Sequence, residues 1–196
     1  MRPVFLSASI PDPRRHPRYI DTADEIAIRE SVSALATVVL HHTTLVFGGH
    51  PAISPLVRLI AHGLDAMDKV RIFQSRFFES VVPRDSREFT DLVWTPAVSN
   101  DRDASLRLMR DLMLNEGPFE AAFFIGGMEG VEDEFDLFSR RWTGTPAFPI
   151  ASTGAAARIL FDRYRDNILP YLSRGWENRL REEFVYRPFF EELLHL

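Results

Sequence analysis

The chain has 196 residues, 45% hydrophobic and 26% charged, with a formal net charge of −5. This length allows one well-buried domain, and the composition is that of a soluble globular protein, neither disordered nor membrane-spanning. The acidic balance argues against general nucleic-acid binding. We therefore expect one domain over residues 1–196, in which residues 166–196 form a C-terminal helical extension, with neither nucleic acid nor a membrane as a partner.

The sequence contains no cysteine, which excludes a disulfide framework, a cysteine nucleophile and a thiolate metal site. The N-terminal segment has an apolar patch of only a few residues before proline and arginine, unlike a secretory signal. The histidines lack the HxxxH and HExxH spacings that place two metal ligands on one helix face. We expect a cytoplasmic protein without a metal or a cofactor.

Apolar runs and helical patterns alternate along the chain. Strands are expected at residues 3–9, 43–47, 69–74 and 145–150, and in the apolar run that begins at 119. Helices are expected at residues 24–40, through 56–64, at 101–115, from the turn after 126 to about 141, and at 155–164, with one or two more in 166–196. Thr22 and Asp24 are both suitable N-caps for the first of these helices.

This alternation predicts an α/β fold, a Rossmann-like three-layer α/β/α sandwich with a mainly parallel sheet of about five to seven strands. Residues 75–98 read as irregular, aromatic and charged. A loop of that length in a compact domain is usually functional or partly structured. The sequence leaves open whether this stretch is a lid.

Small residues stand where three of the expected strands end, as Ser7-Ala8-Ser9, Gly48-Gly49-His50 and Gly126-Gly127. Ligands of open parallel sheets bind at the carboxyl ends of the strands. A glycine pair lacks the Cβ atoms that would block close approach, and a following helix N-terminus offers N–H groups to an anion. The pattern indicates a phosphate or ribose pocket, although such turns can also merely connect elements. Neither GxGxxG nor GxxxxGK[ST] is present, so standard dinucleotide and P-loop binding are not supported.

Glu134 lies one turn into the helix that follows Gly130, from where its carboxylate could reach back over the glycine turn. It could accept ribose hydroxyls or act as a general acid or base, whereas the helix dipole alone accounts for the other acidic residues of this turn. His50 directly follows the Gly48-Gly49 pair and either lines the pocket or faces solvent.

Several arginines are candidates for phosphate contact. Arg107 and Arg110 lie on the helix before the glycine turn and are either phosphate clamps or solvated residues. The basic cluster of Arg14, Arg15 and Arg18 is likewise either a local phosphate contact or a solvated loop.

The run from Gly126 to Glu134, GGMEGVEDE, resembles the PGGxGTxxE motif of the LOG (Lonely Guy, or lysine decarboxylase-like) phosphoribohydrolases. It resembles more closely the variant in the wider SLOG superfamily, to which ligand-sensing domains of bacterial conflict and antiphage systems belong. LOG enzymes carry an arginine sixteen positions before the first glycine, usually followed by a methionine; here these are Arg110 and Met113. The glycine pair at 48–49 and the small residues at 7–9 correspond to the other strand ends of the family.

The resemblance covers residues 3–165 and implies a Rossmann-like domain that binds a nucleotide or a nucleotide-derived ligand, usually as a homo-oligomer, a dimer or higher. In the hydrolases the arginine and the motif glutamate carry cleavage of the N-glycosidic bond, so by resemblance the catalytic roles would fall to Arg110 and Glu134. This sequence departs from the motif: Ile125 replaces proline, one residue is inserted before Gly130, and Val131 replaces the threonine whose hydroxyl would help hold the phosphate.

These departures favour a sensing or binding module for an NAD- or ADP-ribose-related molecule. The alternative is a LOG-type phosphoribohydrolase acting on a nucleoside monophosphate, so enzymatic activity stays open. A further alternative is a structural subunit whose C-terminal aromatic residues pack on a partner, or equally on their own sheet. The expected ligand-binding residues are Ser7, Ser9, Gly48, Gly49, His50, Arg110, Gly126, Gly127, Met128, Gly130, Val131 and Glu134.

Overall fold

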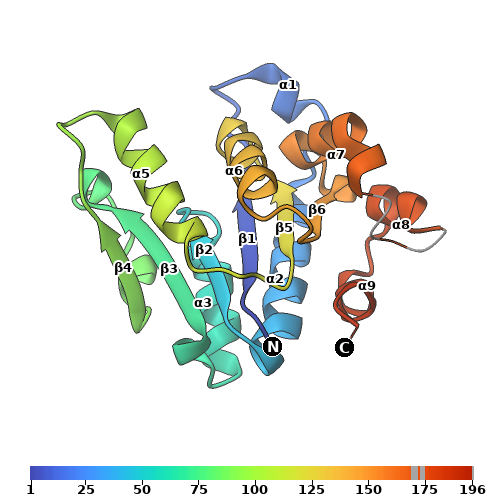
Figure 1. Cartoon of the computed structure of the whole chain (residues 1–196), viewed down its shortest axis with the longest axis horizontal. Coiled ribbons are helices and arrows are strands. Elements are labelled where there is room, and N and C mark those ends of the chain that lie inside the picture. The colour runs from blue at the N-terminus through green and yellow to red at the C-terminus, as the bar shows by residue number, and fades with distance from the viewer. Residues whose placement is uncertain (169–171, 173–174, 196) are drawn as a thin grey trace.

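The computed structural model describes residues 1–168, 172 and 175–195. It has one six-stranded sheet in the order β4-β3-β2-β1-β5-β6, and all neighbouring strands are parallel (Figure 1). The strands are β1 (Val4–Ser9), β2 (Leu45–Gly48), β3 (Val70–Ser75), β4 (Asp91–Thr95), β5 (Ala122–Gly126) and β6 (Ala147–Ile150). The predicted Rossmann-like α/β fold is confirmed.

Helices cover both faces of the sheet (Figure 1). One face packs against α2 (Glu25–His42), α3 (Ser54–Gly63), α8 (Trp176–Glu182) and α9 (Tyr186–Leu193). The other packs against α5 (Arg102–Leu114), α6 (Glu129–Arg141) and α7 (Ala155–Ile168). Short elements are α1 (Pro17–Ile20), α4 (Arg84–Arg87) and the 3₁₀ turns η1 (Met67–Lys69), η2 (Arg76–Phe78) and η3 (Ala151–Thr153).

The central strands are apolar on both sides because both sides are covered. In β5, Phe124 faces the α5–α6 side and Phe123 faces the α2–α9 side. Phe123 meets the fully buried Phe190 of α9, with ring centroids 5.2 Å apart. On the opposite side Phe5 of β1 stacks on Phe138 of α6 at 5.7 Å. Large aromatic contacts of this kind hold the helices on the sheet.

The sequence prediction of an irregular stretch at residues 75–98 was incomplete, because this stretch contains η2, α4 and the edge strand β4. β4 was missed because DLVWT starts with a charge and four of its five residues are only half-buried. The helix predicted from residue 24 is α2, and of its two possible caps Asp24 is the one used: its side chain accepts the Ala27 N–H at 2.9 Å.

The C-terminal aromatic residues divide between core and surface. Phe189 and Phe190 are fully buried against the chain's own sheet and helices, whereas Phe184 is 57% exposed. The part of the predicted extension at 169–171, 173–174 and 196 lies outside the described residues. Across the described chain, no helix is both long and apolar enough to traverse a bilayer.

Candidate functional site

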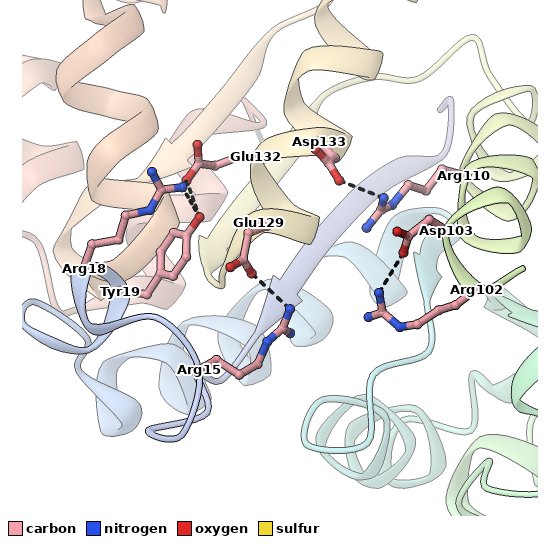
Figure 2. A network of polar contacts seen from close by, with 9 residues as sticks. All are labelled: Arg15, Arg18, Tyr19, Arg102, Asp103, Arg110, Glu129, Glu132 and Asp133. Carbon is pink, nitrogen blue, oxygen red and sulfur yellow. Dashed lines mark hydrogen bonds and ion pairs between the residues drawn. The ribbon is translucent and has the colours of Figure 1, made fainter.

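The ends of β1, β2 and β5 meet at one edge of the sheet. Ser9 of β1 lies opposite Gly126 of β5, and the Gly127 N–H donates to the Ser9 carbonyl oxygen at 2.8 Å. A cleft of about 760 Å³ opens at this edge, between α5 on one side and α6 on the other. That volume lies in the usual range of small-molecule pockets. Figure 2 shows the two walls, with Arg110 reaching from α5 toward Asp133 of α6.

Ten of the residues predicted from the sequence line this cleft: Ser7, Ser9, Gly48, Gly49, His50, Arg110, Met128, Gly130, Val131 and Glu134. Gly126 and Gly127 lie behind its wall. The Gly126 N–H donates to Thr153 Oγ1 at 2.9 Å, and the Gly127 N–H is taken by Ser9, so neither N–H is available to a ligand. Both have positive φ, 56° and 88°. The glycine pair therefore shapes the turn and does not itself face the cleft.

Glu129 and Gly130, the first two residues of α6, line the cleft. Met128 is the N-cap residue and provides no side-chain cap. Within the described residues, the N–H groups of Glu129 and Gly130 have no acceptor. An uncapped helix start carries a partial positive charge and donors directed outward, which together suit an anion.

Arg110 and Glu134 form an ion pair across the cleft. Arg110 Nε lies 3.3 Å from Glu134 Oε1, and Arg110 Nη1 lies 2.9 Å from Asp133 Oδ2. Both side chains of the Arg110–Glu134 pair are largely buried, with 12% and 13% exposed. Burial raises the pKa of Glu134, and the Arg110 charge opposes this by favouring the carboxylate. The two residues that the family resemblance singled out are thus in contact.

Gly130 leaves room for the Arg110 guanidinium. A Cβ atom at this position would lie 2.9 Å from Arg110 Nη2 and nothing else within 4 Å. Because Gly130 has no side chain, Arg110 can lie close against the start of α6.

We expect Gly130→Ala to weaken ligand binding by about fivefold while leaving the melting temperature nearly unchanged, since a flexible guanidinium can move by a few tenths of an ångström and alanine favours the helix. Calorimetric titration and a thermal melt of the same sample measure the two effects. Unchanged affinity in this variant would show that the position of Arg110 does not matter for the ligand.

The polar side chains at the floor of the cleft, Ser7 and His50, form few hydrogen bonds within the described residues. Ser7 is 2% exposed, and its hydroxyl lies close enough to the Glu134 carboxylate to lower the pKa of Glu134, although no hydrogen bond of standard geometry joins them. His50 Nδ1 accepts the Ala52 N–H at 3.2 Å. Burial and the nearby Arg15 lower the pKa of His50 to about 4, so this histidine is neutral at pH 7. A buried hydroxyl without a well-formed hydrogen bond is costly unless a ligand or water satisfies it.

The Gly48-Gly49 pair has a packing role that the sequence did not reveal. Gln74 of β3 donates from Nε2 to the Gly49 carbonyl oxygen at 2.5 Å, and a Cβ on Gly49 would lie 2.0 Å from that nitrogen. The next helix, α3, begins only at Ser54. The helix predicted through residues 56–64 is α3, and a turn at residues 50–53 separates it from the glycine pair.

The cleft residues that the sequence prediction missed include members of the segment between β3 and β4, of α5 and of α6. Phe78, Val81, Val82 and Pro83 of the first segment form an apolar rim, which nothing local in the sequence marks. The missed charged residues are Arg102 and Asp103 of α5 and Asp133, Asp136 and Arg140 of α6. Two of the arginines predicted as possible phosphate contacts, Arg15 and Arg107, also line the cleft.

No set of three or more histidine, aspartate or glutamate side chains in the described part of the chain is arranged to hold a metal ion.

Comparison with known proteins completes the description of the site. No curated protein gives a significant match to the chain. The family model described as the SLOG cluster3 family matches residues 18–174, well over half of the chain, and this range includes Arg110 and the run from Gly126 to Glu134. The chain belongs to the SLOG cluster3 family.

Proposed function

We propose that the protein senses a nucleotide-derived ligand, of the NAD or ADP-ribose kind, by binding it in the cleft between α5 and α6. Membership of the SLOG cluster3 family supports a ligand-sensing or nucleotide-related role at a coarse level. The observation that carries the finer proposal is the convergence of the uncapped start of α6 and the Arg110–Glu134 pair on one 760 Å³ cleft.

The cleft offers a suitable protein group for each part of such a ligand. The N–H groups of Glu129 and Gly130 suit a phosphate. The Glu134 carboxylate and the buried Ser7 hydroxyl beside it suit ribose hydroxyls. The apolar rim around Phe78 and Val82 suits the flat face of a base.

Isothermal titration with ADP-ribose, cyclic ADP-ribose isomers, NAD and AMP tests the proposal. We expect at least one of them to bind with micromolar affinity, and adenosine, which lacks a phosphate, to bind far more weakly because it cannot use the start of α6. No heat with any of the four nucleotides, at protein concentrations that detect micromolar binding, would contradict the proposal.

A LOG-type phosphoribohydrolase is the second candidate, and the environment of Glu134 is what favours it. A carboxyl whose pKa is raised by burial, held beside Arg110, is a suitable acid or base for cleaving an N-glycosidic bond. Chromatography after incubation with nucleoside monophosphates would then show free base and ribose phosphate. Glu134→Gln and Arg110→Ala would each abolish the release. Val131, which has no hydroxyl to hold the phosphate, favours binding over hydrolysis.

We also propose that the protein forms a homo-oligomer. Phe184 and Val185 are adjacent between α8 and α9 and are 57% and 64% exposed, so together they offer apolar surface to a second subunit. Light scattering coupled to size-exclusion chromatography gives the number of subunits.

A further inference from the structure

The segment between β1 and α2, residues 10–23, contains α1 and contributes Arg15 to the lining of the cleft, and we call it the strap. Its C-terminal half is firmly attached. Arg18 Nη2 and the Tyr19 hydroxyl donate to Glu132 Oε1 of α6 at 2.7 and 2.8 Å, and Tyr19 is fully buried (Figure 2). Thr22 Oγ1 accepts the Ala155 N–H of α7 at 2.9 Å. The strap is therefore fixed to α6 and α7 at its base.

Arg15 lies on the other half of the strap and enters the cleft (Figure 2). Its Nη2 atom is 3.3 Å from Glu129 Oε2, and the two side chains are 46% and 44% exposed. The same guanidinium contributes to the lowered pKa of His50, so its charge acts at the end of β2 as well as at the start of α6. Arg15 thus stands between the two sides of the cleft mouth.

The Glu129 carboxylate is poorly satisfied in this arrangement. Its Oε2 atom is buried, and within the described residues it accepts no hydrogen bond; the contact with Arg15 is an ion pair without hydrogen-bond geometry. The neighbouring N–H groups of Glu129 and Gly130 are also without an acceptor. Deeper in the same cleft the buried Ser7 hydroxyl lies close enough to the Glu134 carboxylate to lower its pKa, without a hydrogen bond of standard geometry. The Glu129 and Gly130 N–H groups thus lack the acceptor that a ligand phosphate would supply.

We infer that Arg15 is a further phosphate-binding residue and that Glu129 is an internal anion that competes with the ligand for it. This inference rests on the proposed function. On binding, a ligand phosphate accepts hydrogen bonds from the start of α6 and from Arg15, and the Glu129 side chain turns out to solvent. The diphosphate of ADP-ribose carries two negative charges on four non-bridging oxygens, more charge and more acceptors than one carboxylate, so it is the stronger partner for a guanidinium.

Two substitutions with opposite expected effects on ligand affinity test the exchange, in which a ligand phosphate replaces Glu129 as the partner of Arg15. Arg15→Gln removes the phosphate contact and is expected to weaken binding of ADP-ribose about tenfold. Glu129→Gln removes the competing anion and its repulsion of phosphate, and is expected to tighten binding about fivefold. Arg14→Gln is the matched control, because Arg14 lies one residue away on the same strap, is 89% exposed and pairs only with Asp12 among the described residues. It should leave the affinity unchanged.

The titrations are done by calorimetry with ADP-ribose and, separately, with inorganic pyrophosphate. If the wild type binds none of the nucleotides, the proposed function fails, but opposite effects of Arg15→Gln and Glu129→Gln on pyrophosphate binding would still support the exchange. If ADP-ribose binds and both substitutions change its affinity in the same direction, or neither does, the exchange is overturned while the proposed function stands. Absence of pyrophosphate binding by Glu129→Gln, together with absence of ADP-ribose binding, would overturn both.

Discussion

Replacing Arg110 with alanine is expected to abolish detectable nucleotide binding, with a loss of affinity of about 100-fold or more. Arg110 supplies a largely buried positive charge on the α5 wall and holds Asp133 and Glu134 of α6 at 2.9 and 3.3 Å. Without it, the anionic ligand would meet the Asp133 and Glu134 carboxylates with no compensating cation on the α5 wall. Because the pKa of Glu134 is already raised by burial, removing the arginine raises it further, and the carboxyl becomes protonated closer to neutral pH.

Arg141→Ala is the matched control for this experiment. Arg141 also joins α6 to α5, through the Asp111 carbonyl oxygen at 2.8 Å and its carboxylate at 3.2 Å, but it does not line the cleft. Its loss should leave binding intact. Arg110→Lys, which retains a charge but not the fork of donors, should bind with intermediate affinity if the variant folds as the wild type does. Wild-type affinity in Arg110→Ala would show that the ligand binds elsewhere.

Gly154→Ala is expected to lower the free energy of unfolding by about 3 kcal/mol. Gly154 has φ 71° and ψ −157°, a region that is essentially restricted to glycine. A Cβ at this position would lie 1.7 Å from the Thr22 carbonyl oxygen and 2.5 Å from its carbonyl carbon. These are backbone atoms at the base of the strap, and they cannot move aside as the tip of a side chain can. Urea unfolding followed by circular dichroism measures the loss.

Gly144→Ala separates backbone strain from the steric clash. Gly144 has φ 90°, but a Cβ there would meet nothing within 4 Å. It should therefore cost only about 1 kcal/mol, the penalty of a left-handed conformation alone. Equal losses in the two glycine variants would mean that the contact between Gly154 and Thr22 contributes nothing. A loss in Gly154→Ala accompanied by weaker ADP-ribose binding would also connect the base of the strap to the site.

The fold could be predicted because its strands are buried on both sides. A run such as AFFIG in β5 is apolar at every position and ends in a glycine, so strand and turn are both marked locally. The edge strand β4 carries no such mark, since one of its sides has no neighbouring strand and its residues are half-buried. Edge strands are specified by the sheet they join more than by their own sequence.

The topology of a parallel sheet predicts that the strand ends lie together, but the hydrogen-bond partner of each backbone N–H group at these ends could not be predicted from the sequence. The sequence indicated that Gly126 and Gly127 would hold phosphate with their N–H groups, yet these are bonded to Thr153 and Ser9, residues distant in the chain. Such pairings depend on tertiary packing. Glu134 and Arg110 were identified by family resemblance and helical spacing, and their contact follows from α5 and α6 lying on the same face of the sheet.

A crystal structure of the protein with ADP-ribose tests the proposed site most directly. We expect the ligand in the cleft between α5 and α6, with phosphate oxygens within hydrogen-bond distance of the Glu129 and Gly130 N–H groups and a ribose beside Arg110 and Glu134. ADP-ribose bound outside this cleft, or bound inside it with its phosphates away from the start of α6, would show that the proposed site is wrong.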